Sequence, residues 1–217
     1  MKQSHDLDML DREAYTAVFC DVLDDMGYRT QSTNGDVRPL WPDARLVGYA
    51  RTVRVEAVEK ASESPYEKEF TLVDALNPGD VVVAECGSTR SAFWGELLAT
   101  AAQLRGARGA LIDGYCRDVF KVRDLAFPVF ARGTAPTDSK GRTEVAETDI
   151  PITFDGVRVK TGDLVFGDFD GIVIVPRDVA DEAITKALEK VHGERTVFEA
   201  LKKGMSAREA WERWGIL

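Results

Sequence analysis

The chain has 217 residues, enough to bury one sizeable core, and its composition does not separate into parts of different character. Its formal net charge of -9 argues against a nucleic-acid surface, because phosphate binding requires a clustered excess of lysine and arginine. The three cysteines are widely spaced and form no CxxC pair, which argues against a disulfide framework and against a zinc ribbon.

The apolar runs and the first residues predict a cytoplasmic protein. The N-terminal sequence lacks the apolar core of a signal peptide, and no apolar run approaches the roughly 20 residues that a membrane span requires. A reducing compartment also suits unpaired cysteines. We therefore expect one domain over residues 1–217, with neither a membrane nor a nucleic acid among its partners.

The first elements alternate between helix, loop and strand. Apolar residues at helical spacing predict an amphipathic helix over residues 11–26, with Gly27 as its stop. Glycine, proline and asparagine predict a loop over residues 30–42, and alternating polarity predicts a strand over residues 51–58. The polar residues 59–70 have the composition of a mobile insertion.

The middle of the chain predicts a strand, helix, strand unit. A turn sequence leads into a short buried strand over residues 81–84, an Ala- and Leu-rich helix is expected over residues 92–104, and a second strand follows over residues 110–112. Short links favour a parallel right-handed crossover. The active site is then expected beyond the carboxyl ends of these strands.

The last third predicts two short antiparallel strands and then helices. The strands cover residues 164–166 and 172–175, an apolar stripe predicts a helix from about residue 179, and a further helix is expected through Phe198 and Leu201. Residues 207–217 form a short amphipathic tail with two tryptophans. A terminal aromatic cluster of this kind is typical of an oligomer contact.

The candidate site combines a glycine-containing segment with an Arg-Asp pair. The segment of residues 87–98 supplies backbone N–H groups near a helix start, where unpaired donors and the helix dipole suit a carboxylate. Arg117 is suited to a bidentate grip on that carboxylate, and Asp118 is a hard oxygen ligand for Mg²⁺ or Mn²⁺. Glu96 is placed to orient waters that such a cation keeps.

Simpler interpretations compete with this site. An isolated Arg-Asp pair is more often a surface ion pair, and the glycines of the segment also suit an ordinary turn. The absence of GxxxxGK[ST] excludes a P-loop, and two distant histidines are too few for a His-ligand zinc site or a Ser-His-Asp triad. Cys116 stands beside a positive residue, but a small buried side chain is its more common role.

Several stretches resemble the regulator-of-ribonuclease-activity-A-like (RraA-like) family, which includes the 4-hydroxy-4-methyl-2-oxoglutarate aldolases. The main similarity lies in residues 94–102, Asp113-Gly114 and Arg117-Asp118, and it extends through residues 127–133, 162–165, 170–173 and 215–217. The family signature is an acidic residue, twenty intervening positions, then Arg-Asp. Here Glu96 is that acidic residue and residues 97–116 supply the spacing.

The resemblance implies an α/β/β swivelling (phosphohistidine-like) domain with mixed sheets and flanking helices, assembled as a homotrimer or homohexamer with sites between subunits. The positions that match the substrate loop are Gly95, Glu96, Leu97 and Leu98, while Arg117 matches the carboxylate-binding arginine and Asp118 the metal ligand. A glutamate from a neighbouring C-terminal helix, Glu194 or Glu199, is expected to help order the metal waters. The family usually has Asp at the position of Glu96, and the extra methylene displaces the carboxylate by about 1.5 Å.

The implied activity is that of a class II pyruvate aldolase and oxaloacetate decarboxylase, a carbon–carbon lyase. In our hypothesis Mg²⁺ or Mn²⁺ on Asp118 chelates a small 2-oxo acid, Arg117 holds its carboxylate, and Glu96 assists the water that removes the 4-hydroxyl proton. Aldol cleavage and decarboxylation then leave the same pyruvate enolate. The alternative is a non-catalytic regulator of ribonuclease E, in which an acidic protein masks a basic partner surface.

Overall fold

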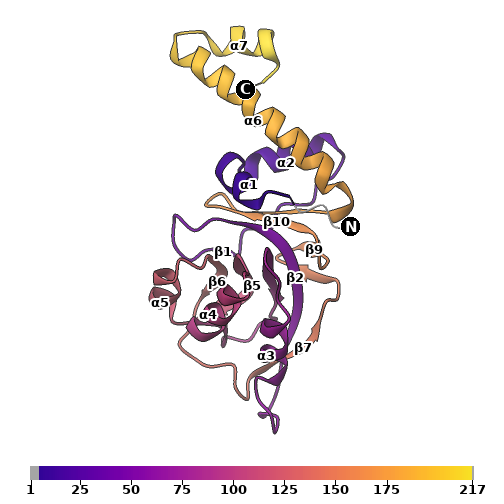
Figure 1. Ribbon diagram of the computed structural model, residues 1–217, viewed down its shortest axis with the longest axis vertical. Coiled ribbons are helices and arrows are strands. Elements are labelled where there is room, and N and C mark those ends of the chain that lie inside the picture. Colours follow the sequence, from indigo (N-terminus) through magenta and orange to yellow (C-terminus); the bar gives the residue numbers. More distant parts are fainter. Residues whose placement is uncertain (1–4, 217) are drawn as a thin grey trace.

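The protein is a mixed α/β fold built around one nearly closed sheet with flanking helices (Figure 1). The computed structural model describes residues 5–216, so Leu217 of the predicted tail lies outside the described residues. The large sheet has the order β1-β6-β5-β3-β2-β10-β11, with β4 added to β5 and β7 added to β2, and β8 and β9 form a separate hairpin. The predicted class, α/β with mixed sheets and flanking helices, is confirmed.

The bounds of the elements are as follows. The strands are β1 (Arg38–Pro39), β2 (Leu46–Ala57), β3 (Asp80–Glu85), β4 (Ala92–Trp94), β5 (Gly109–Cys116), β6 (Val129–Thr134), β7 (Thr143–Thr148), β8 (Ile152–Phe154), β9 (Val157–Val159), β10 (Leu164–Gly167) and β11 (Ile172–Val175). The helices are α1 (Leu7–Glu13), α2 (Thr16–Asp25), α3 (Glu67–Asp74), α4 (Glu96–Leu104), α5 (Val119–Asp124), α6 (Ala180–Lys202) and α7 (Ala207–Trp214), with a 3-10 turn at Arg177–Val179.

The centre of the sheet is parallel, as the strand, helix, strand pattern predicts. Strand β3 pairs in parallel with β2 on one side and with β5 on the other. In the pairing with β5, Val83 lies opposite Leu111. The apolar run of β3 is fully buried because both faces of a parallel strand are covered. Strands β10 and β11 pair antiparallel with Val165 opposite Ile174, which confirms the predicted pair.

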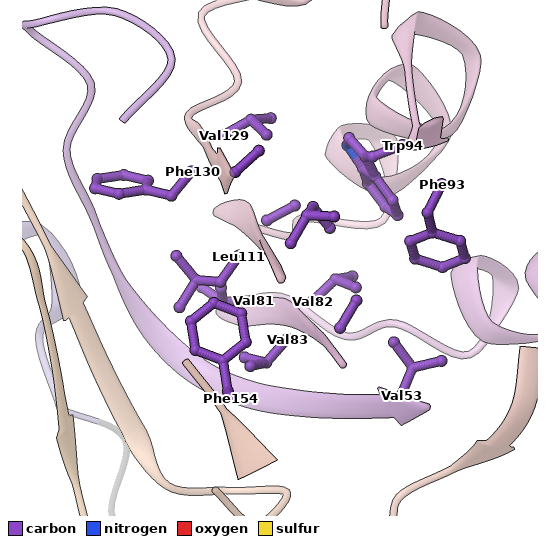
Figure 2. Packing of buried hydrophobic residues seen from close by; sticks show 14 of the residues in the cluster. Val53, Val81, Val82, Val83, Phe93, Trp94, Leu111, Val129, Phe130 and Phe154 are labelled. Atoms are coloured by element: carbon purple, nitrogen blue, oxygen red, sulfur yellow. The ribbon is translucent and has the colours of Figure 1, made fainter. Parts of the chain in front are cut away.

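Buried aromatic and aliphatic side chains fill the space between this sheet and its helices. Figure 2 shows Leu111 and Val81 in this core, and it shows Phe93 and Trp94 together at the end nearer the helices. The rings of Phe93 and Trp94 lie 6.1 Å apart, and Trp94 stacks at 6.3 Å on Phe127. Strand β4, which carries Phe93 and Trp94, is therefore anchored in the core by its aromatic side chains.

Two of the predicted helices have different bounds. The helix expected over residues 11–26 is broken at Ala14 and Tyr15, because the buried carboxylate of Asp168 accepts bonds from the backbone N–H of Thr16 at 2.9 Å and its hydroxyl at 2.7 Å, fixing a new start. The helix expected over residues 92–104 begins only at Glu96, because Ala92–Trp94 pair with β5 as β4.

Two further expectations were wrong in detail. The stretch expected as a mobile insertion contains the start of α3, which buries Glu69, Leu72 and Val73. The two helices expected after residue 179 are one continuous helix, α6, of 23 residues. In Figure 1, α6 packs over α2 and then extends past the body of the molecule, with α7 folded back at its far end.

Among residues 5–216, no helix combines the length and the apolar character that crossing a membrane demands.

Candidate functional site

The two stretches that the sequence singles out meet at one edge of the sheet. Arg117 and Asp118 directly follow β5, and Gly95 joins β4 to α4. A Cβ atom on Gly95 would lie 3.0 Å from Cγ of Arg117 and 3.1 Å from Oδ2 of Asp118, and the backbone N–H of Arg117 donates to Trp94 O at 2.9 Å. The segments are therefore in direct contact, beyond the carboxyl ends of the parallel strands.

A cavity of about 260 Å³ opens at this contact. Gly95, Glu96, Leu97, Leu98, Arg117 and Asp118 all line it, whereas Glu194 and Glu199, which are expected to act from a neighbouring subunit, do not. Its walls are formed by Tyr66, Glu69, Phe70, Ala92, Phe93, Trp94, Gly95, Glu96, Leu97, Leu98, Arg117, Asp118, Asp138 and Ser139. A small cavity with apolar walls and a few charged groups has the general character of a small-molecule site.

The backbone differs between the two segments that meet at the cavity. Asp118 adopts the left-handed region at φ 56° and precedes α5, so its carboxylate is held at the turn between strand and helix. Gly95 is extended at φ -166° and precedes α4. Gly95 is required for space rather than for its dihedral angles, because a side chain there would press on Arg117 and Asp118.

The start of α4 supplies backbone donors to the cavity. The first N–H groups of a helix have no partner within the helix, and within residues 5–216 no side chain caps those of α4. Glu96, Leu97 and Leu98 carry these groups and line the cavity. The turn that carries these groups also brings Gly95 against Arg117.

Arg117 is held by two carboxylates. Its Nη1 lies 3.3 Å from Oδ1 of Asp138, its Nε lies 3.7 Å from Oδ2 of Asp118, and about a third of its side chain remains exposed. Asp138 in turn accepts a hydrogen bond from the hydroxyl of Tyr66 and one from the backbone N–H of Ser139 at 2.9 Å. The bond to Asp138 raises the pKa of Tyr66 to about 12, so Tyr66 stays a donor.

Glu96 lies at the other side of the cavity mouth. Its Oε2 accepts a hydrogen bond from Nζ of Lys121 at 2.8 Å, and this contact raises the pKa of the lysine. Asp118 adds a weaker attraction to the same ammonium group. The ammonium group of Lys121 therefore attracts two carboxylates, that of Glu96 at the start of α4 and that of Asp118 before α5.

The donor set fits Mg²⁺ or Mn²⁺ in its chemistry. Asp118 and Glu96 offer hard carboxylate oxygens, and neither histidine nor cysteine lines the cavity. In the described part of the chain, His, Cys, Asp and Glu form no group of three or more that could surround a metal. A cation here would be held by few protein oxygens and would keep several waters, as Mg²⁺ commonly does.

Five lining residues lie outside the site that the sequence predicted: Tyr66, Glu69, Phe70, Asp138 and Ser139. Tyr66 and Asp138 are 72 positions apart and meet only through tertiary packing. Glu69 had a readable signal, because it stands three and four positions before Leu72 and Val73 on the buried stripe of α3. It is 4% exposed, and burial followed by the charge of Asp138 raises its pKa to about 7.

The structure also decides the minor candidates. Cys116 is fully buried, and burial raises its pKa to about 12, so it is no nucleophile at neutral pH. The ring of His5 contacts Tyr49 and Asp181 and does not line the cavity. The structural role expected for Cys116 is confirmed.

The sequence profile of the RraA-like family, described as Aldolase/RraA, matches residues 16–174, well over half of the chain. The chain belongs to the RraA-like family. A Halalkalibacterium halodurans protein named "Putative 4-hydroxy-4-methyl-2-oxoglutarate aldolase" is 30% identical to it, over 90% of this chain and 89% of that protein.

Solved structures of the RraA-like fold agree with this assignment. An uncharacterized protein from Pseudomonas syringae pv. tomato matches with a TM-score of 0.81 and 29% identity, covering 94% of this chain and 95% of that one. RraAS2 of Streptomyces coelicolor, described as an unusual member of the RNase ES inhibitor RraA protein family, matches with a TM-score of 0.77 and 26% identity, covering 94% and 100%. The names of RraA-like relatives thus include both an aldolase and a ribonuclease inhibitor.

Proposed function

We propose that this RraA-like chain is a divalent-metal-dependent lyase that cleaves 4-hydroxy-2-oxo acids, such as 4-hydroxy-4-methyl-2-oxoglutarate, to pyruvate, and that it also decarboxylates oxaloacetate. The proposal depends on one observation: Gly95, Arg117 and Asp118 touch at the mouth of a single small cavity. A surface ion pair would have no need of uncapped helix amides facing the same space.

Two groups bind the substrate carboxylate in this proposal. The guanidinium of Arg117 forms charge-assisted hydrogen bonds with it, and the amides of Glu96, Leu97 and Leu98 add donors and the positive end of the α4 dipole. Both sets of donors are fixed by the fold before substrate binds. The 2-oxo group is thereby directed toward Asp118, and the rest of the acid toward the apolar walls.

Asp118 would hold Mg²⁺ or Mn²⁺, with Glu96 orienting its waters. Such a cation, when bound, supplies the positive charge that stabilises an enolate oxygen. Glu96 is placed to accept, through water, the 4-hydroxyl proton that must leave before the C3–C4 bond breaks. Decarboxylation of oxaloacetate needs no such base and ends at the same pyruvate enolate, so one site serves both reactions.

Pyruvate release tests the proposal. We would incubate the protein with oxaloacetate and with several 4-hydroxy-2-oxo acids, with Mg²⁺ or with EDTA, and compare Arg117→Ala and Asp118→Ala. Each substitution is expected to lower the rate by about 100-fold or more, because each removes charge stabilisation in the transition state. Activity that survives both substitutions, or a lysine adduct trapped by borohydride with pyruvate, would refute this chemistry.

The competing proposal is a non-catalytic regulator of ribonuclease E, and the Streptomyces relative's description gives it support. The same assay separates the two, because a regulator releases no pyruvate under any metal condition. Binding to ribonuclease E that is unaffected by Arg117→Ala, in a chain without lyase activity, would favour it.

We also propose a cytoplasmic homotrimer or homohexamer. Leu97, Leu104 and Phe120 on α4 and α5 are each at least 80% exposed, which is unusual for apolar side chains beside an active site. The projecting α6 could then reach a neighbour's site. Tyr15 of the same chain already donates to the Glu194 carboxylate, whereas Glu199 is exposed and lies 3.8 Å from Nζ of Lys202, a longer contact, so we assign the metal-water role to Glu199.

A further inference from the structure

Glu69 is a buried acid of the cavity wall to which the proposed mechanism gives no role. It lies on α3, whose other inward residues, Leu72 and Val73, pack into the core, and only 4% of its surface is exposed. It lines the same cavity as Arg117 and Asp118. Burying a carboxyl group costs free energy, so a buried acid in the wall of a polar cavity is a candidate functional group.

The groups that face Glu69 come from three segments. Asp138 and Ser139 precede β7, Glu144 lies on β7, and Arg117 follows β5. Burial has the largest effect and raises its pKa to about 7, Asp138 and Glu144 act in the same direction, and Ser139 and Arg117 oppose them. A pKa near this value suits a group that gives up and regains a proton at neutral pH.

Glu69 and Glu96 stand in opposite environments within one cavity. Glu96 is ion-paired with Lys121 at 2.8 Å, and a third of its side chain is open to solvent. Glu69 is buried, and its neighbours include the negatively charged carboxylates of Asp138 and Glu144. Two acids whose surroundings differ in this way are suited to the two separate proton transfers of a reaction, one as base and one as acid.

We propose that Glu69 is a catalytic acid that protonates C3 of the pyruvate enolate. The O–H bond of its carboxyl group breaks, the electron pair of the enolate C2–C3 double bond forms the new C3–H bond, and the 2-oxo group is restored. Glu69 is left as a carboxylate and regains its proton from solvent. This inference rests on the proposed lyase function and assigns the step that follows carbon–carbon cleavage or loss of CO₂.

Hydrogen exchange at C3 of pyruvate isolates this step. In exchange, the enzyme removes a C3 proton to form the enolate and then returns a deuteron from solvent to the same carbon. Wild type with Mg²⁺ in D₂O is expected to exchange the pyruvate methyl protons, followed by NMR. Glu69→Gln is expected to slow exchange by about 100-fold, which is typical for loss of a general acid or base. Wild-type exchange should rise with pH through about 7, because removal of the C3 proton requires the carboxylate form.

Glu67→Gln is the matched control, because Glu67 stands on the same helix and is exposed. It should leave exchange and its pH dependence unchanged. Glu69→Asp keeps the acid and should recover part of the rate, with circular dichroism confirming that each variant is folded. Glu69→Gln that exchanges at the wild-type rate, while wild type releases pyruvate, overturns this inference alone; a wild type with neither pyruvate release nor exchange overturns the lyase function as well.

Discussion

Nη1 of Arg117 lies 3.3 Å from the carboxylate of Asp138, so the arginine that we assign to the substrate carboxylate already has an acidic partner. Asp138 is itself held by the hydroxyl of Tyr66 and the backbone of Ser139, and it cannot easily turn away. A bound organic acid must therefore share the guanidinium with Asp138. The pair orients Arg117 at the cost of repulsion toward the anion that it binds.

Asp138→Asn is expected to tighten pyruvate binding several-fold. Removing the negative charge relieves repulsion toward the substrate carboxylate, while the loss of a part-exposed ion pair costs only about 0–1 kcal/mol of orientation. Calorimetric titration of pyruvate in the presence of Mg²⁺ measures the change, with Arg117→Ala as the variant that should lose binding. Weaker binding in Asp138→Asn would show that orientation of the guanidinium outweighs the repulsion.

Gly95→Ala is expected to lower kcat/KM by about 100-fold without unfolding the protein. The backbone at Gly95 accepts any residue, but the new methyl would lie 3.0 Å from Arg117 and 3.1 Å from Asp118 and displace both. Gly133→Ala is the control, since its methyl would meet Tyr115 at an ordinary 3.5 Å. Steady-state kinetics and a melting curve for each variant decide it; full activity in Gly95→Ala would mean that the contact has no part in binding.

The sequence predicts the parts of this site that depend on local patterns. Strands β3 and β5 are continuous apolar runs, and Arg117 with Asp118 follows β5 directly, so their place at the strand ends is readable. The left-handed conformation of Asp118 carries no such signal. The family signature brings Glu96 to the same site although twenty residues intervene.

The parts that were missed depend on contacts between distant residues. Ala92–Trp94 have the composition of a helix start, but pairing with β5 and burial of Trp94 favour a strand. Tyr66 and Asp138 form a hydrogen bond although they are 72 positions apart in the sequence, and a local sequence pattern cannot predict such a contact. Glu69 is buried because α3 packs against β7 and α4; its spacing to Leu72 and Val73 was readable, but the polar composition of residues 59–70 favoured a loop over a helix there.

Lys121→Met is expected to tighten Mg²⁺ binding by a few-fold at low salt. The ammonium group of Lys121 attracts the carboxylates of both Glu96 and Asp118, and its positive charge opposes a cation at the same place. Titration calorimetry at two ionic strengths measures the effect, which should shrink at high salt because Lys121 is largely exposed. Lys186→Met on α6 is the control. Unchanged Mg²⁺ affinity would place the cation away from Glu96 and Asp118.

Glu69→Gln is expected to stabilise the metal-free protein at alkaline pH and to have little benefit in acid. The pKa of Glu69 is raised from its ordinary 4.5 to about 7, so the stability of wild type is fully present below pH 4.5 and decreases as pH rises toward 7. Each pKa unit corresponds to about 1.4 kcal/mol, which limits the decrease to roughly 3 kcal/mol. Glutamine has no proton to lose, so the free energy of unfolding of the variant lacks this decrease.

Urea unfolding of both proteins at pH 5 and pH 8, without added metal, measures the difference. The advantage of Glu69→Gln over wild type should grow between the two pH values, whereas Glu67→Gln, with its exposed side chain, should follow wild type at both. A difference between Glu69→Gln and wild type that is the same at pH 5 and pH 8 would mean that Glu69 titrates below this window. Glu69 would then already be ionised at neutral pH, so it would have no proton to donate to the enolate.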